Sequence, residues 1–132
     1  MLQIVYNIYM KVRIFAKNFK LTPALKAQVD EKLVRPVAKL LEALDQKMDL
    51  PFDVELAKST KHHRQGKIWY CEVNLTAPFA AKPIRARAME LSIFAAIDEV
   101  KYEIEREIKK YKERFRTKGI RDLRKAKAKR RS

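Results

Sequence analysis

Lysine and arginine are the residues of this chain whose number and spacing suggest a chemical role. The 132 residues include 31 lysines and arginines against 16 acidic residues, which gives a net charge of +15. Such an excess attracts polyanions, with nucleic acid as the first expectation and an anionic membrane surface as the second. A polyanionic partner is therefore predicted. The alternative is that the charge serves only to keep the protein soluble.

Enzyme chemistry has little support in the sequence. Two glycines are too few for a phosphate-binding loop or a dinucleotide fingerprint. Cys71, the single cysteine, excludes an internal disulfide and lies in an apolar segment, so we expect a buried, inert thiol in a reducing compartment. The adjacent His62 and His63 have no further metal ligands nearby in the sequence. We therefore predict no catalytic residues, no metal, no cofactor and no small-molecule substrate.

Three groups of basic residues are candidates for contacts with RNA phosphates. One group lies on a helix predicted over residues 23–44, one in a polar turn, and one on the later part of a helix that begins near Ser92. Phosphate contacts provide affinity without reading base sequence. For any single lysine, solvation of a helix face is an equally good explanation. The candidate RNA-binding residues are Lys26, Lys32, Arg35, Lys39, Lys61, His62, His63, Arg64, Arg106, Lys109, Lys110, Lys112, Arg114 and Arg116.

Two amphipathic helices are predicted to carry most of these side chains. The first begins with Thr22 as N-cap and Pro23 in the first turn, and Pro36 inside it predicts a kink or two abutting helical pieces. The second carries apolar residues at steps of three and four from Ile93 to Phe115. One face of each helix is therefore expected to pack on a core.

Four strands are predicted from the alternation of apolar and polar residues. These strands lie at residues 10–16, 52–56, 67–76 and 84–88. The expected fold is α+β, with the order β-α-β-β-β-α and two helices packed on one face of a four-stranded sheet. On the other face, Arg85 and Arg87 are expected to form cross-strand pairs with acidic residues rather than to contact RNA. Trp69 is expected to pack rather than to stack on a base.

Three segments are distinguished along the chain. Residues 1–9 form an apolar N-terminal extension without the features of a signal peptide, and the sequence leaves open whether translation starts at Met1 or Met10. Residues 10–116 form the predicted domain. Residues 117–132 contain eight basic residues and one acidic residue, so this tail carries +7 of the total charge and the rest of the chain +8. With little to bury, the tail is expected to be disordered when free.

Several motifs in this order resemble the ribosome hibernation promoting factor and ribosome-associated inhibitor A family. The strongest is the helix segment F-A-A-I-D-E-V-K-Y-E-I-E-R-E-I-K-K-Y-K, which is similar to the family's opening of the last helix. The helix start L-T-P-A-L, the strand end V-E-L-A-K-S-T and the turn T-K-H-H-R-Q-G-K before the strand E-V-N-L also fit. The resemblance covers about residues 10–116, and the chain looks like a short form.

This resemblance implies a fold similar to the double-stranded RNA-binding domain and a cytoplasmic inhibitor of translation in ribosome hibernation during stress. The implied partner is the small ribosomal subunit with its ribosomal RNA, bound in the decoding groove where messenger and transfer RNA would sit. Lys32, Arg106 and Lys110 fall where family members usually carry a basic residue, whereas Glu103 falls where several carry lysine. Long members add a dimerisation domain, so self-driven ribosome dimerisation is not implied here.

Two other functions fit the composition. A general structured-RNA-binding protein or RNA chaperone would bind free duplex RNA about as well as ribosomes. A membrane-surface protein would use the tail and residues 1–9 on anionic lipid. The sequence has no run of 18 or more apolar residues, so no segment is expected to span a membrane, and we predict RNA rather than a membrane as the partner.

Overall fold

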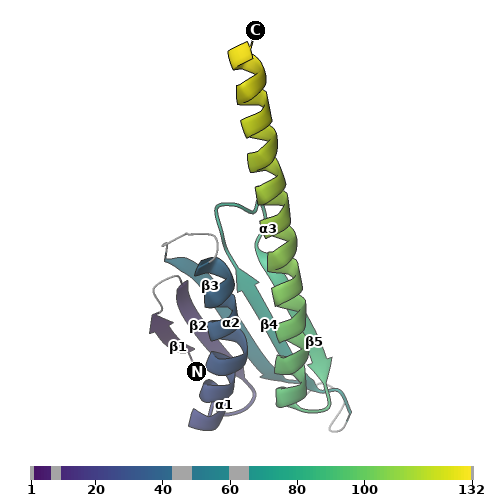
Figure 1. The fold of residues 1–132 in the computed structure, drawn as a ribbon. Coiled ribbons are helices and arrows are strands. Elements are labelled where there is room, and N and C mark those ends of the chain that lie inside the picture. Colours follow the sequence, from purple (N-terminus) through teal and green to yellow (C-terminus); the bar gives the residue numbers. More distant parts are fainter. Residues whose placement is uncertain (1, 7–9, 43–48, 60–65, 132) are drawn as a thin grey trace.

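Among the described residues, five strands form one sheet and two helical segments pack on one of its faces (Figure 1). The structure is a computed structural model that describes residues 2–6, 10–42, 49–59 and 66–131, with side chains at 10–42, 49–59, 66–114 and 123–128. In chain order the elements are β1 (Leu2–Tyr6), β2 (Met10–Lys17), α1 (Pro23–Val29), the π-helical segment η1 (Asp30–Val34), α2 (Arg35–Glu42), β3 (Leu50–Lys58), β4 (Trp69–Leu75), β5 (Ile84–Glu90) and α3 (Ile93–Arg131).

The strands form one sheet in the order β1-β2-β3-β4-β5. β2 and β3 are parallel, and the other neighbouring strands are antiparallel. A parallel pair needs a crossover connection, which α1, η1 and α2 supply. The predicted α+β fold and the order of its elements from β2 to α3 are confirmed. β1 adds a fifth strand from residues that were expected to form only an extension.

The core lies between the sheet and the helices. Along each central strand the residues alternate, with one set fully buried beneath the helices and the other partly exposed on the uncovered face. The predicted apolar stripe of α3 is buried from Ile93 to Ile108, and Tyr111 packs against its edge. The side chain of Phe115 lies outside the described residues. The side chains of α3 that are almost fully buried are Ala96, Ile97, Val100, Ile104 and Ile108.

A π-helical segment divides the first helix. The Oγ1 of Thr22 accepts a hydrogen bond from the backbone N–H of Leu25 at 3.2 Å, as predicted for the N-cap. The buried residues recur every four positions, at Leu25, Val29, Leu33, Val37 and Leu41. In an α-helix each step of four over-rotates by about 40°, so five such residues would spread around the helix. The wider π turn reduces this drift and keeps the stripe facing the sheet.

Pro36 is the second residue of α2, directly after the π segment. The prediction of two abutting helical pieces is therefore confirmed, although the irregular turn precedes the proline. The backbone N–H of Arg35 donates to the carbonyl of Asp30, five residues earlier. The predicted end of this helix at residue 44 falls outside the described residues.

The C-terminal helix α3 is one continuous helix of 39 residues. Ser92 caps it, with its Oγ accepting a hydrogen bond from the backbone N–H of Ala95 at 3.1 Å. The structure differs from the predicted disordered tail, because α3 continues through Arg131. The physical reason is local: the tail contains no proline and is rich in Lys and Arg, with two alanines, and these residues are strong helix formers.

Candidate nucleic-acid interface

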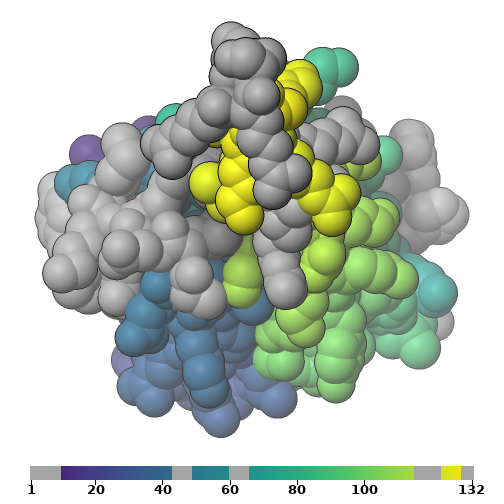
Figure 2. Space-filling model, turned by 45° about the horizontal axis from the view of Figure 1, so that its top comes forward, coloured from purple at the N-terminus to yellow at the C-terminus, as the bar shows by residue number. Residues whose placement is uncertain are grey.

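The two helical segments, α1–η1–α2 and α3, lie side by side on the same face of the sheet and run in the same direction (Figure 1). Figure 2 shows the blue surface of α1 and α2 next to the green surface of α3. Across this boundary the Nζ of Lys32 in η1 approaches an Oδ1 of Asp98 in α3 at 3.7 Å. The two helices are therefore in contact, so their basic residues can form one continuous strip.

Some of the predicted RNA-binding residues on α1–η1–α2 are already in ion pairs. Lys32 pairs with Asp98, and the guanidinium of Arg35 contacts the Oδ2 of Asp30 at 2.8 Å. The ion pairs between described residues do not include Lys26, which is half-buried, or Lys39, which is exposed. Of the predicted residues on these helices, Lys39 is thus the one best placed to contact an external phosphate.

The predicted cations of α3 lie mostly on its exposed side. Arg106 and Lys109 are exposed and take no part in the ion pairs between described residues. Lys110 pairs with Glu107 at 3.0 Å, and the guanidinium of Arg114 lies 5.6 Å from the ring centroid of Tyr111. Lys112 is half-buried. For Arg116 only the helical backbone is described.

A shallow hollow of about 440 Å³ lies on the outer side of α3. Its lining includes three of the predicted RNA-binding residues together with an exposed tyrosine that the sequence analysis did not single out. The tyrosine could have been found from its position, because it falls off the apolar stripe and one turn before Arg106. The lining residues are Tyr102, Glu105, Arg106, Lys109, Lys110 and Glu113.

The predicted turn contacts Lys61, His62, His63 and Arg64 lie outside the described residues, so their prediction stays untested. Within the part of the chain that the structure describes, no three His, Cys, Asp or Glu side chains gather as metal ligands would. Cys71 is fully buried, and burial raises the pKa of its thiol well above the ordinary value. A thiol held neutral in this way is a poor nucleophile.

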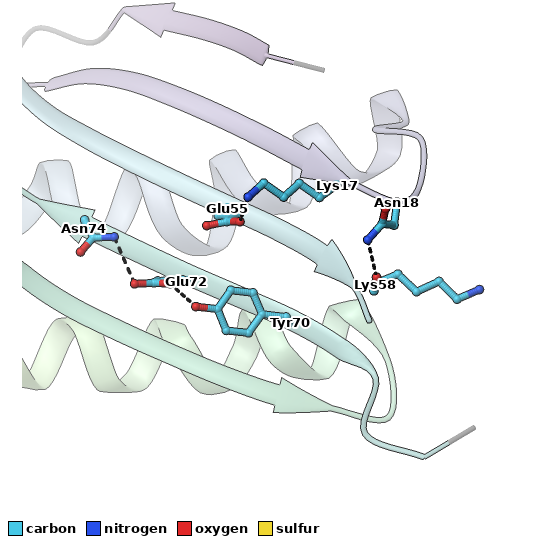
Figure 3. A network of polar contacts seen from close by, with 7 residues as sticks. All are labelled: Lys17, Asn18, Glu55, Lys58, Tyr70, Glu72 and Asn74. Carbon is cyan, nitrogen blue, oxygen red and sulfur yellow. Dashed lines mark hydrogen bonds and ion pairs between the residues drawn. The ribbon is translucent and has the colours of Figure 1, made fainter. Parts of the chain in front are cut away.

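On the uncovered face of the sheet, opposite charges pair across the strands. The guanidinium of Arg13 makes two contacts with the carboxylate of Asp53, at 2.6 and 2.8 Å. Lys17 pairs with Glu55 at 3.0 Å (Figure 3), and Arg85 with Glu72 at 3.1 Å. The predicted cross-strand pairing is therefore confirmed for Arg85. These pairs partly neutralise the positive charge of this face.

The aromatic residues of β4 are engaged within the protein. Trp69 meets Phe19 edge to face, with ring centroids 5.4 Å apart, which confirms packing as its role. The hydroxyl of Tyr70 donates a hydrogen bond to the carboxylate of Glu72 (Figure 3). Partial burial, followed by this bond, raises the pKa of Tyr70. The phenol therefore stays neutral at any ordinary pH.

Comparison with known proteins gives one family match and several similar folds. A family model described as sigma 54 modulation protein / S30EA ribosomal protein matches residues 12–116. The N-terminal domain of Protein Y from Thermus thermophilus is similar, with a TM-score of 0.56 and 23% identity over 80% of this chain and 99% of that one. A ribosomal subunit interface protein from Coxiella burnetii has a TM-score of 0.56 and 16% identity, over 76% and 96%.

At these identities the two solved structures support the fold alone. A search of curated proteins found no match. No helix among the described residues has the length and apolar character needed to cross a membrane.

Proposed function

Because the chain belongs to the sigma 54 modulation protein / S30EA ribosomal protein family, we propose that it binds the small ribosomal subunit at the decoding groove and inhibits translation. Bound there, the protein sterically blocks messenger and transfer RNA. It acts by occupancy in the cytoplasm, as a hibernation factor, and needs no cofactor. The description of the family as a ribosomal protein supports the ribosome as the partner.

The observation that carries the proposal is the set of exposed cations on two adjacent helices. Lys39 on α2 and Arg106 and Lys109 on α3 take no part in the ion pairs between described residues. Folded RNA is recognised largely through its shape and backbone, which requires cations held on a rigid surface. Ribosomal RNA in the groove supplies the phosphates, and many weak contacts add up to the affinity.

The test is co-sedimentation of the purified protein with separated ribosomal subunits, followed by chemical footprinting of the small-subunit RNA. The expected result is saturable, near one-to-one binding with protection in the decoding region. Binding in proportion to RNA length, without a discrete footprint, would instead identify a general RNA-binding protein.

A matched pair of double variants assigns the binding to the helical face. Arg106→Glu/Lys109→Glu reverses two exposed charges on α3, and Lys82→Glu/Arg87→Glu reverses two exposed charges elsewhere. Each double variant lowers the net charge by four, from +15 to +11. The α3 variant is expected to lose most of its affinity and the control variant to lose much less. Equal losses would mean that total charge, and not this face, determines binding.

A further inference from the structure

Tyr102 is an exposed aromatic residue on the outer side of α3. Its exposed fraction is 68%, the largest among the exposed large hydrophobic side chains on the sheet-packed part of α3. Tyr111, about two and a half turns later, is half-buried and packs against the core. Tyr102 therefore contributes little to the core, and its ring is accessible to another molecule.

The surroundings of Tyr102 are cationic. Tyr102, Arg106 and Lys109 follow at steps of four and three, which places them on one face of the helix. Together they line the hollow of about 440 Å³. The ammonium of Lys101 lies 5.0 Å from the centroid of the Tyr102 ring.

Carboxylates at the hollow are already engaged. Glu105 is paired with Lys101 at 3.1 Å, and both side chains are largely buried. Glu113, at the other end, also interacts with another group. Arg106 and Lys109 take no part in the ion pairs between described residues, so they remain available to an external anion. The face thus combines an exposed ring, with the Lys101 ammonium over one of its two sides, and two available cations.

We propose that Tyr102 stacks on an unpaired nucleobase of the bound RNA while Arg106 and Lys109 contact the phosphates beside it. Every nucleobase offers an aromatic face, and protein aromatic residues flanked by cations bind unpaired bases in this way. This inference rests on the proposed function for the source of the RNA. The other proposed contacts of this surface are all with phosphates, and the stacking adds a contact that requires an unpaired base.

The experiment measures binding of three full-length variants to small ribosomal subunits and to two RNA hairpins. The hairpins are identical except for a single unpaired 2-aminopurine in one of them. Tyr102→Ala removes the ring, and Tyr102→Phe retains it. The matched control is Phe94→Ala, since Phe94 is another exposed aromatic of α3, 50% exposed and near its N-terminus. Circular dichroism checks that each variant keeps its helix content.

Tyr102→Ala is expected to weaken binding to the subunits and to the bulged hairpin by roughly tenfold, the equivalent of about 1.4 kcal/mol. Tyr102→Phe and Phe94→Ala should bind like the wild type, and none of the three should change binding to the fully paired hairpin. The salt slope should stay the same, because stacking releases no counterions. The 2-aminopurine fluorescence should be quenched by every form except Tyr102→Ala.

Equal affinity of Tyr102→Ala and wild type for the bulged hairpin, with equal quenching, would overturn the inference. A wild-type protein that binds the bulged hairpin but not the subunits would contradict the proposed function and leave the stacking intact. Loss of affinity for subunits alone, without any effect on the hairpin, would mean that the ring contacts ribosomal protein and not a base.

Discussion

Removal of the C-terminal part of α3 should flatten the salt dependence of RNA binding. The perturbation is truncation after Arg116, which deletes eight basic residues and one acidic residue. The described side chains of this segment, residues 123–128, are all exposed, and Leu123 is 66% exposed. The truncated protein should therefore keep its fold, with a change in unfolding free energy of about 0.5 kcal/mol or less.

The magnitude follows from the helical arrangement of the charges. At about 100° per residue the eight basic positions are distributed around the helix axis, so about half of them can face an RNA surface at once. Each phosphate contact contributes about 0.7–0.9 to the slope of log K against log salt, which gives a change of about 3 for four contacts. Between 50 and 200 mM salt, this part of the affinity changes by roughly 50- to 100-fold.

The assay is a titration of fluorescent RNA from the decoding region at several salt concentrations with both proteins. Their affinities should converge at high salt and diverge at low salt. A second variant with glutamine at each basic position of residues 124–131 keeps good helix formers and separates charge from helix length. The same slope for full-length and truncated protein would refute the idea that the tail contacts phosphates.

Three further outcomes test the folded domain itself. Ile104→Ala in the buried stripe of α3 should lower the unfolding free energy by about 2–5 kcal/mol, measured by urea denaturation, and a loss below about 1 kcal/mol would contradict the packing described. The buried thiol of Cys71 should react with an aromatic disulfide reagent only on unfolding, so fast labelling of native protein would show that the sheet opens there. A hydrogen bond to Glu90 raises the pKa of Glu99, so the folded state binds this proton more tightly than the unfolded state. This contribution therefore makes stability fall as pH rises above the ordinary range of a glutamate. Relative to Glu99→Gln, the wild type should lose stability in urea titrations as the pH rises above the ordinary pKa of a glutamate, and parallel curves would disprove the effect of this hydrogen bond.

The strands and the helical stripes could be predicted because their signals are local. Val12 and Ile14 alternate with charged neighbours, and one face of the sheet follows directly from that period. The apolar residues of α3 repeat at helical steps, so its buried face was equally clear. The family resemblance inferred from the motifs is confirmed by the match over residues 12–116.

Features that depend on distant partners could not be predicted. The strand β1 exists because its residues pair with the open edge of β2, and no sequence period in a five-residue segment specifies that partner. The pairing of Lys32 with Asp98 requires two helices to meet, and it removes one predicted phosphate contact from the available set. Arg35 reaches Asp30 across a π turn, a spacing of five that α-helical periodicity does not suggest.

Because α3 is one continuous helix, the distance of its C-terminal end from the sheet and the rotation of that end about the helix axis are both fixed. Beyond Tyr111 the helix extends by about 30 Å, so charges near Arg131 lie at a set distance from the sheet. One residue inserted between the two parts would advance the tip by about 1.5 Å and turn it by about 100°. A helix whose basic positions are distributed around its axis tolerates such a rotation, whereas a surface with cations on one side only does not. The face around Tyr102 would therefore determine how the protein is oriented on a partner, and the C-terminal end of α3 would determine how far its contacts extend.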